Sequence, residues 1–163
     1  MAKKEDMPKT RSKFNVTNDT DKRTYNGIVF DSVLEMKYYR DVLLPKVESG
    51  EVTNYELQKK YVLQEGFVRN GKRVLPITYI ADFYIEYADG RVDVIDIKGM
   101  ADNVAKMKKK MFWYKFPELD YQWIVYIKKF GGWLDYDECM RLRKAEKRRK
   151  AGMKGDDDNV EEG

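Results

Sequence analysis

The twenty residues from Ile80 to Gly99, IADFYIEYADGRVDVIDIKG, constrain the fold more than any other stretch of the chain. Two apolar, alternating runs flank a turn at residues 88–90, and this pattern predicts a β-hairpin. Gly90 can take the positive φ that the last position of a three-residue hairpin loop needs. A loop of this kind places Tyr87 opposite Arg91, so the register of the whole hairpin follows from it.

Counting two residues at a time along each strand from this loop places Asp82 near Asp96. Lys98 lies on the same side as Asp96, because side chains two apart on a strand share a face. Two acids directly opposed across a sheet repel each other, with Cβ atoms roughly 5 Å apart. That spacing suits two carboxylates that share a divalent cation, which takes oxygen ligands at about 2.0–2.6 Å. The hairpin therefore predicts a metal site with an ammonium group beside it.

The alternative is that Asp82 and Asp96 are ordinary solvated acids, as Glu86 and Asp93 could be. The sequence around the pair argues against this alternative. An ionised carboxylate inside a sheet needs a partner. The immediate neighbours of the pair are apolar residues typical of a sheet interior: Ile80, Ala81, Phe83, Ile95 and Ile97.

The length and composition of the chain restrict its class and chemistry. The 163 residues fit one domain with a hydrophobic core. No apolar run is long enough to span a membrane, and the polar start MAKKEDMPKTRSK predicts no signal peptide. Cys139 is the one cysteine, so we expect no disulfides. These features together predict a protein of the reducing cytoplasm with no membrane partner. Histidine is absent, so hydrolytic chemistry would need carboxylates, lysine and a hard ion, Mg²⁺ before Mn²⁺, with no small-molecule cofactor.

The charge is distributed unevenly along the chain. The net charge is +4, but the last eight residues, DDDNVEEG, hold five acids and no base. The rest of the chain therefore carries +9, which predicts a polyanionic partner, although a basic body is also common in proteins without one. We expect residues 1–20 to form a flexible basic arm, 21–150 the folded domain and 151–163 a disordered acidic tail.

The first helix is predicted after a short strand at 25–30. Ser32 is a good N-cap, the apolar spacing continues from it, and Pro45 should stop the helix. Glu35 stands three residues after Ser32, which is the spacing of a capping box. Glu35 therefore has two alternative roles: it closes the cap, or it points from the first turn towards the hairpin acids.

Antiparallel strands should follow at 54–63, 67–68 and 73–77. The Asn-Gly pair within 69–72 predicts a tight turn, and Pro76 requires an edge position or a bulge. After Gly99 a helix is predicted to about Phe116. Its expected apolar stripe is Val104, Met107, Met111 and Tyr114, and its expected opposite face is Lys106, Lys109, Lys110 and Trp113.

A buried strand at 121–127, which could pair parallel with an earlier strand, comes next. It is followed by a basic loop at 128–132 and a basic helix from 136 to about 150. Basic residues here could bind phosphates, and Trp113 could stack on a base, although each lysine or arginine could equally lie on a solvated face. Together with Lys106, Lys109, Lys110 and Trp113, the predicted DNA-binding residues are Lys128, Lys129, Arg141, Lys144 and Arg148.

One set of residues resembles the motif of the PD-(D/E)XK nuclease superfamily. It consists of a helical Glu35, then Asp82, then Asp96-Ile97-Lys98 on a hairpin. The phrases GIVFDSVLEMKYY, LQKKYVLQ, ITYIADF, VIDIKG and KMKKKMFWYKFP are similar to small phage-encoded, Holliday-junction-resolvase-like endonucleases, once catalogued as a domain of unknown function. The likeness covers roughly residues 24–145. It implies an α/β fold of the restriction-endonuclease type, with an α-β-β-β-α-β core, a mixed sheet flanked by helices and an added C-terminal basic helix. This sequence departs from the usual motif in having Ala81 in place of proline and Asp96 in place of glutamate.

The resemblance also implies roles for single residues. Asp82, Asp96 and the Ile97 carbonyl would bind Mg²⁺, helped by Glu35, and Lys98 would position or deprotonate the attacking water. Gln58 lies in a matching phrase and would touch the site. The implied protein is a Mg²⁺-dependent endonuclease acting on branched or recombining phage DNA as a homodimer in the host cytoplasm. The alternatives are a non-catalytic nucleic-acid-binding module and a nicking or restriction-type nuclease.

Overall fold

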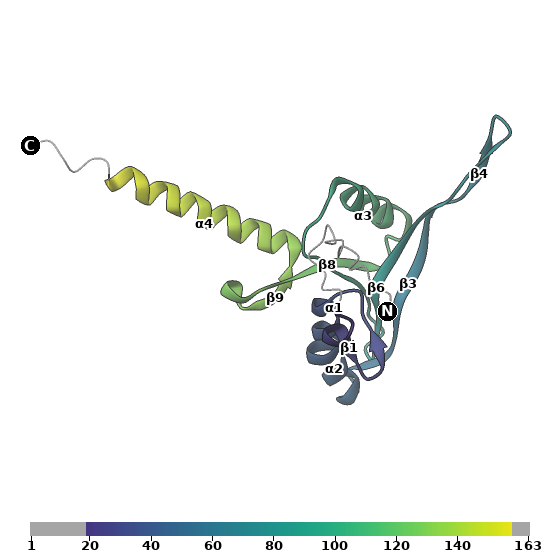
Figure 1. Cartoon of the computed structure of the whole chain (residues 1–163), viewed down its shortest axis with the longest axis horizontal. Coiled ribbons are helices and arrows are strands. Elements are labelled where there is room, and N and C mark those ends of the chain that lie inside the picture. Colours follow the sequence, from purple (N-terminus) through teal and green to yellow (C-terminus); the bar gives the residue numbers. More distant parts are fainter. Residues whose placement is uncertain (1–18, 158–163) are drawn as a thin grey trace, which may run out of the picture.

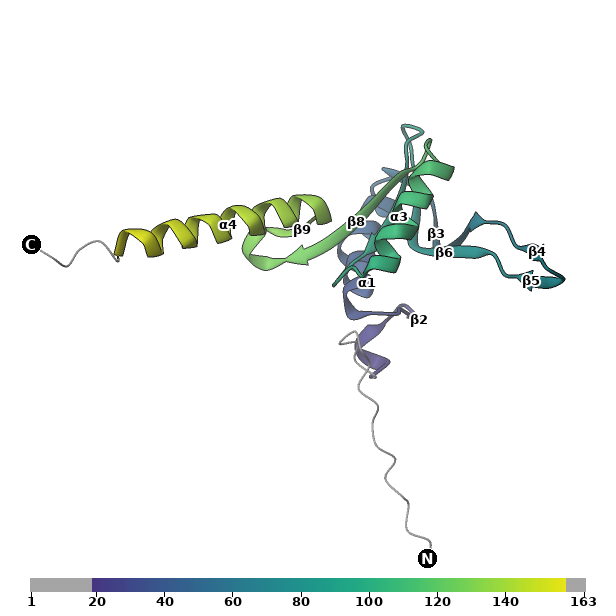
Figure 2. The same cartoon turned by 90° about the horizontal axis from the view of Figure 1, so that it is seen from above.

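The computed structural model of the chain describes residues 19–157, which form a mixed α/β fold (Figures 1 and 2). Most of the predicted arm and the last six residues of the predicted tail lie outside the described residues. The elements in chain order are η1 (Asp21–Arg23), β1 (Thr24–Tyr25), β2 (Ile28–Val29), α1 (Val33–Tyr38), η2 (Tyr39–Leu43), α2 (Leu44–Glu48), β3 (Val52–Gln64), β4 (Phe67–Arg69), β5 (Lys72–Val74), β6 (Ile77–Tyr87), β7 (Val92–Ile97), α3 (Asn103–Lys115), β8 (Asp120–Ile127), η3 (Lys128–Phe130), β9 (Gly132–Asp135) and α4 (Tyr136–Asp157).

One five-stranded sheet, in the order β3-β6-β7-β8-β9, organises the fold. β7 and β8 pair in parallel and the other neighbours are antiparallel, so the sheet is mixed. The parallel pairing expected for the strand after the crossover helix is confirmed. No helix of the described part is long and apolar enough to cross a membrane.

Two hydrophobic cores lie on the two faces of this sheet. One contains Phe83, Ile95 and Ile97 with the apolar residues of α1 and η2. The other contains Val94 with Phe112 of α3 and the aromatic residues of β8. Val94 and Ile95 point to opposite faces because successive strand side chains alternate. The helices therefore cover both faces, α1, η2 and α2 on one and α3 on the other, as Figure 1 shows.

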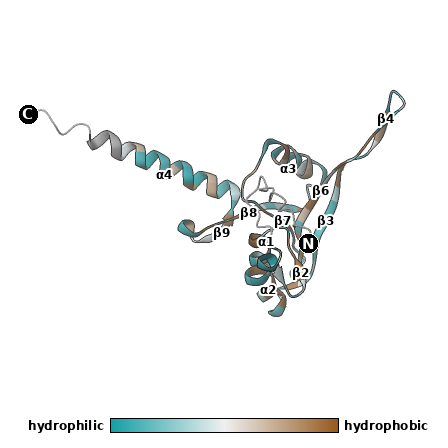
Figure 3. Ribbon diagram, in the orientation of Figure 1, coloured by the Kyte–Doolittle hydropathy of each residue, from teal (hydrophilic) through white to brown (hydrophobic). Residues whose placement is uncertain are grey.

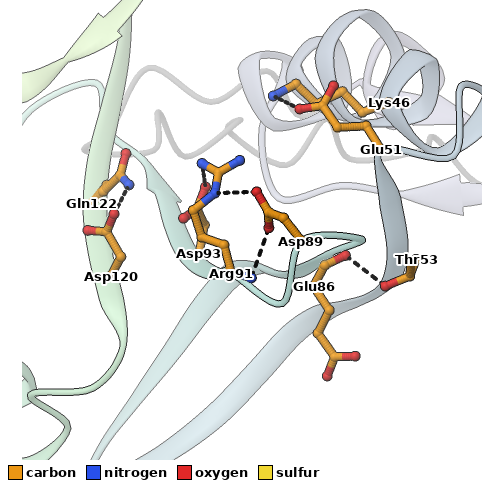
Figure 4. A network of polar contacts seen from close by, with 9 residues as sticks. All are labelled: Lys46, Glu51, Thr53, Glu86, Asp89, Arg91, Asp93, Asp120 and Gln122. Carbon is orange, nitrogen blue, oxygen red and sulfur yellow. Dashed lines mark hydrogen bonds and ion pairs between the residues drawn. The ribbon is translucent and has the colours of Figure 1, made fainter.

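The β6–β7 hairpin forms as the sequence predicts. Gly90 has φ +85°, the Gly90 amide donates to the Tyr87 carbonyl at 3.0 Å, and the Tyr87 amide donates to the Arg91 carbonyl at 2.9 Å. Around the turn, Arg91 forms ion pairs with Asp89 and Asp93 (Figure 4). Phe83 and Ile95 form the last pair of the β6–β7 ladder, and Asp82 and Asp96 are next in register.

The strand expected at 25–30 is instead a small hairpin. Asn26 and Gly27 both have positive φ, +50° and +76°, so the chain reverses between β1 and β2. Asn-Gly favours such a turn because both residues tolerate the left-handed region. The same chemistry at Asn70-Gly71, with φ +50° and +70°, closes the β4–β5 hairpin as predicted.

Pro45 does not stop the first helix, which was the expectation. The helix continues to Glu48, with Pro45 in the first turn of α2. Proline has no amide to donate and its ring clashes with the preceding turn of a regular α-helix. The wider π-helical turn η2 directly precedes it and accommodates both features.

The face of α3 that packs on the sheet also differs from the prediction. Lys109 and Phe112 are buried, whereas Val104, Met107 and Tyr114 of the expected apolar stripe are exposed. The buried face is completed by Ala105, Lys108 and Phe116, which are partly buried. The helix is therefore rotated away from the predicted orientation, with aromatic residues of β8 beneath it.

The C-terminal part contains one strand that the sequence analysis missed and a longer helix than expected. β9 follows Gly131 and Gly132, which have φ +95° and +106°, and it pairs antiparallel with β8. α4 then runs to Asp157, beyond the predicted end near Lys150. The helix projects from the body, and the turns of it that are coloured in Figure 3 are mostly hydrophilic.

Candidate active site

Glu35 reaches the site from the first turn of α1. The Ser32 hydroxyl accepts a hydrogen bond from the Glu35 amide at 3.1 Å and donates one to the Glu35 carboxylate at 2.9 Å. The side chain is buried at 6% exposure, and its Oε2 atom has no hydrogen-bond partner among residues 19–157. Glu35 therefore joins the cap through the Ser32 hydroxyl, in place of the backbone contact of a full capping box, and its other oxygen lies in the interior.

Asp82, in the middle of β6, and Asp96, near the end of β7, come together where the pairing of the two strands ends. The Ile97 amide donates to Asp82 Oδ2 at 2.7 Å, which ties the two strands where their ladder ends. Asp96 is buried at 3% exposure, and Lys98 Nζ forms an ion pair with its Oδ2. The predicted neighbourhood of two acids and one ammonium group is therefore present.

The charges of the three carboxylates influence one another. Burial, followed by the charges of Asp96 and Glu35, raises the pKa of Asp82 to about 9. Burial raises the pKa of Glu35 to about 7, with Asp31 and Asp96 contributing repulsion and the Ser32 hydroxyl opposing it. Glu35 and Asp82 therefore resist ionisation, and a cation among the three carboxylates would offset their repulsion.

Gln58 touches the site, as the resemblance implied. Its side-chain amide donates to Asp82 Oδ1 at 3.3 Å from the neighbouring strand β3. The residue has φ +54°, a conformation uncommon for residues other than glycine and concentrated at functional sites. It stands between the paired positions Leu57↔Phe83 and Lys59↔Ala81, directly across from Asp82.

The sheet twists sharply at this position. Ala81 and Phe83 are two residues apart and would share one face of a flat strand. Instead Ala81 packs in the core under α3 and Phe83 packs in the core under α1. This switch from one core to the other coincides with the left-handed backbone of Gln58 and with the last pairing of β6 with β7. It brings Asp82 to the edge between the two cores.

Trp123 is a part of the site that sequence reasoning missed. It is the Cα partner of Asp96 in the parallel pair β7–β8, and Lys98 Nζ lies 5.4 Å from its ring centroid. Lys109 Nζ lies 4.3 Å from the same ring. Predicting this contact would require the register of the parallel β7–β8 pair. The sequence of the crossover through α3 does not specify that register.

The predicted DNA-binding residues divide into exposed and internal positions. Lys109 is buried at 7% exposure between Trp113 and Trp123 and pairs with Asp137 at 3.6 Å, so the expectation that it lies on an exposed face is wrong. Trp113 is 45% exposed, but its indole N–H donates to the Tyr121 carbonyl. Lys129 pairs with Glu146, and Arg141 pairs with Glu138. The remaining predicted residues are exposed: Lys106, Lys110, Lys128, Lys144 and Arg148.

The donor set of the site fits a hard divalent cation. Carboxylate oxygens are the ligands that Mg²⁺ and Mn²⁺ prefer, and the partnerless Oε2 of Glu35 supplies one of them in the interior. As they are placed, the acids of the described residues form no group of three or more that would hold a metal ion directly. Lys98 and the Ile97 amide contact two of the carboxylates, so coordination by all three would require small side-chain movements.

The raised pKa values predict how the stability of the metal-free protein changes with pH. Glu35 and Asp82 bind protons more tightly in the folded state than in the unfolded state, so the free energy of unfolding falls as pH rises from 5 to 8. In Asp82→Asn this fall should be smaller by more than about 1.4 kcal/mol, the equivalent of one pKa unit.

Urea denaturation at both pH values, in EDTA, measures the difference. Asp89→Asn, which changes an exposed acid at the tip of the same hairpin, is the matched control and should behave as the wild type. An equal fall in Asp82→Asn and the wild type would contradict the prediction.

Comparison with known proteins gives one family match. The family is described as "Protein of unknown function (DUF1064)", and its match spans residues 11–132. This span contains Glu35, Asp82, Asp96 and Lys98. No curated protein matches the chain significantly.

Proposed function

The chain belongs to the DUF1064 family, and we propose that it is a metal-dependent endonuclease that hydrolyses DNA phosphodiester bonds. One observation carries this proposal. Three buried or partly buried carboxylates from α1, β6 and β7 lie close enough that the charge of Asp96 raises the pKa of both Asp82 and Glu35, and Lys98 contacts Asp96. A purely structural core gains nothing from opposed acids, whereas a hard-metal site needs them.

The order of the elements supports the same proposal. A helix, three antiparallel strands, a crossover helix and a parallel strand follow one another as α1, β3, β6, β7, α3 and β8. This order is consistent with the α-β-β-β-α-β order of the restriction-endonuclease-like core that the motif resemblance implies. In such a core the acids and the lysine come from the positions that Glu35, Asp82, Asp96 and Lys98 occupy here.

The residues of the site have distinct proposed roles. Asp82, Asp96, Glu35 and the Ile97 carbonyl would hold Mg²⁺, with Mn²⁺ as the alternative ion. Bound there, the ion would supply Lewis-acid polarisation of the scissile phosphate and lower the pKa of water. Lys98 is placed to orient the attacking water or take its proton, and its positive charge opposes the charge that develops on the phosphate.

The exposed basic residues support a polyanionic substrate. Five of the predicted DNA-binding residues are exposed, so they can contact backbone phosphates without reading sequence. They are Lys106 and Lys110 of α3, Lys128 after β8, and Lys144 and Arg148 of α4. Branched DNA such as a four-way junction is the substrate that the resemblance implies. Resolving a junction takes two symmetric cuts, which a homodimer with two-fold symmetry would provide.

Cleavage assays on three substrates test this proposal. The protein is incubated with supercoiled, linear and four-way-junction DNA, with Mg²⁺ or with EDTA. Metal-dependent cleavage of any substrate is the expected result, and paired cuts on the junction alone would identify a resolvase. Nicking of every substrate would indicate a nicking or restriction-type nuclease. Binding without cleavage in either Mg²⁺ or Mn²⁺ would overturn the proposal in favour of a binding module.

A further inference from the structure

The hairpin β4–β5 and the residues that connect it to β3 and β6, 65–76, form a two-stranded ribbon that projects from the body (Figures 1 and 2). A two-stranded hairpin alone is marginally stable in water. This ribbon continues the β3–β6 pair, whose register runs to Gln64↔Ile77, so the main sheet supports it. The chain thereby maintains an extended arm outside both cores.

The base of the ribbon is built to fix its direction. A Cβ atom on Gly66 would lie 3.0 Å from the Val74 carbonyl oxygen and 3.2 Å from Pro76 Cδ, so the close approach of the two strands there favours glycine. Lys115 of α3 pairs with Glu65 at 3.8 Å beside this point. The arm therefore leaves the sheet at a defined place.

The surface of the ribbon is cationic and unpaired. Arg69 and Lys72 are Cα partners across the ladder, and Arg73 lies opposite Val68. All three cations are exposed, and within residues 19–157 none of them takes part in an ion pair. Like charges directly opposed across a sheet are destabilising, so an anionic partner between them would relieve an unfavourable arrangement.

The dimensions of the arm fit duplex DNA. The major groove of DNA, about 12 Å wide, admits a two-stranded β-ribbon. Eleven residues separate Gln58, which faces Asp82, from Arg69, so the tip lies at most about 36 Å from the site at roughly 3.3 Å per residue. One turn of DNA spans about 34–36 Å.

We propose that the β4–β5 ribbon is a DNA-binding arm, in which Arg69 and Lys72 contact backbone phosphates of a duplex about one helical turn from the bond held at Asp82 and Asp96. This inference rests on the proposed nuclease function. It adds a contact on a surface distinct from α3, the 128–132 loop and α4. The exposed Val68 and Leu75, at 71% and 67%, would lie against the walls of the groove.

Salt-dependent binding tests the arm. Fluorescence anisotropy with a 30-base-pair duplex of arbitrary sequence is measured in EDTA, so that no cleavage is needed. Log affinity falls as log salt rises, and each lost phosphate contact makes this fall less steep by about 0.9. Arg69→Gln/Lys72→Gln should therefore reduce the steepness by about 1.8. The control Lys22→Gln/Lys46→Gln removes two charges from η1 and α2 and should leave the slope unchanged. Melting curves check that both variants fold.

Three outcomes distinguish the arm from its alternatives. If the wild type binds DNA and the ribbon variant keeps the same slope, the arm is not a DNA contact although the nuclease proposal survives. If the wild type binds no DNA, both proposals fail. If Val68→Ser/Leu75→Ser abolishes self-association in sedimentation velocity without changing the DNA slope, the ribbon is an arm between two copies of the chain.

Hydroxyl-radical footprinting then tests where the arm lies. The wild type should protect a backbone patch about one helical turn to one side of the cleavage position. Arg69→Gln/Lys72→Gln should lose that patch and keep the protection at the cut. Loss of protection at the cut alone would contradict the placement of the arm.

Discussion

Asp96→Asn is expected to reduce DNA cleavage by at least about 10³-fold while DNA binding stays within about twofold of the wild type. Asparagine keeps the shape of the buried side chain but removes the charge that pairs with Lys98. It also removes one of the hard oxygen ligands that the proposed ion requires. Single-turnover cleavage in Mg²⁺ and anisotropy in EDTA measure the two quantities separately.

The matched control for this variant is Asp89→Asn. Asp89 lies at the turn of the same hairpin, where its carboxylate accepts a hydrogen bond from the Arg91 amide at 2.9 Å (Figure 4). Asparagine can accept the same bond, so cleavage should equal that of the wild type. Lost DNA binding in a folded Asp96→Asn protein would show instead that the acid is structural.

Lys98→Gln is expected to lower cleavage by about 10²- to 10⁴-fold, the range contributed by a positioned acid or base. The same change should leave the affinity for Mn²⁺ unchanged or make it tighter, because the ammonium no longer competes for the Asp96 carboxylate. The Mn²⁺ affinity measured by titration calorimetry should therefore not fall when the cleavage rate falls. That divergence separates a catalytic lysine from one that only supports the fold.

Lys37→Gln, which changes an exposed lysine on α1, is the control for Lys98→Gln and should affect neither measurement. Lys98→Arg retains a positive charge but has no accessible neutral form at working pH. It should recover cleavage if the lysine acts by charge alone and fail to do so if the lysine takes a proton. Full activity of Lys98→Gln would exclude the residue from the chemistry.

The hairpin was predictable because a short loop with Gly90 fixes an alternating register, and Asp82, Asp96 and Lys98 follow from it by counting. Glu35 could be placed on a helix, but its burial depends on how α1 packs against the sheet. The sequence around Ser32 therefore left two alternatives, and the structure shows a buried Glu35 that bonds the Ser32 hydroxyl through one oxygen.

The orientation of α3 could not be deduced in the same way. Its residues offer two faces with comparable apolar content, so periodicity did not identify the buried one. The choice depends on Trp123, whose ring receives the ammonium of Lys109 only once β8 has paired in parallel with β7. Pro45 was misjudged for a related reason, because a wide turn such as η2 has no simple sequence signature.

The isolation of α4 has a consequence for how the protein meets a partner. From Met140 to Gly152 the side chains of α4 are exposed or only partly buried, and the pair Glu146–Lys150 is a local contact between its turns. Such pairs contribute about 0.2–0.5 kcal/mol each. The helical and unfolded forms of the distal turns are therefore close in free energy. A polyanion that binds the helical form would increase its population by mass action, so that affinity and helicity rise together.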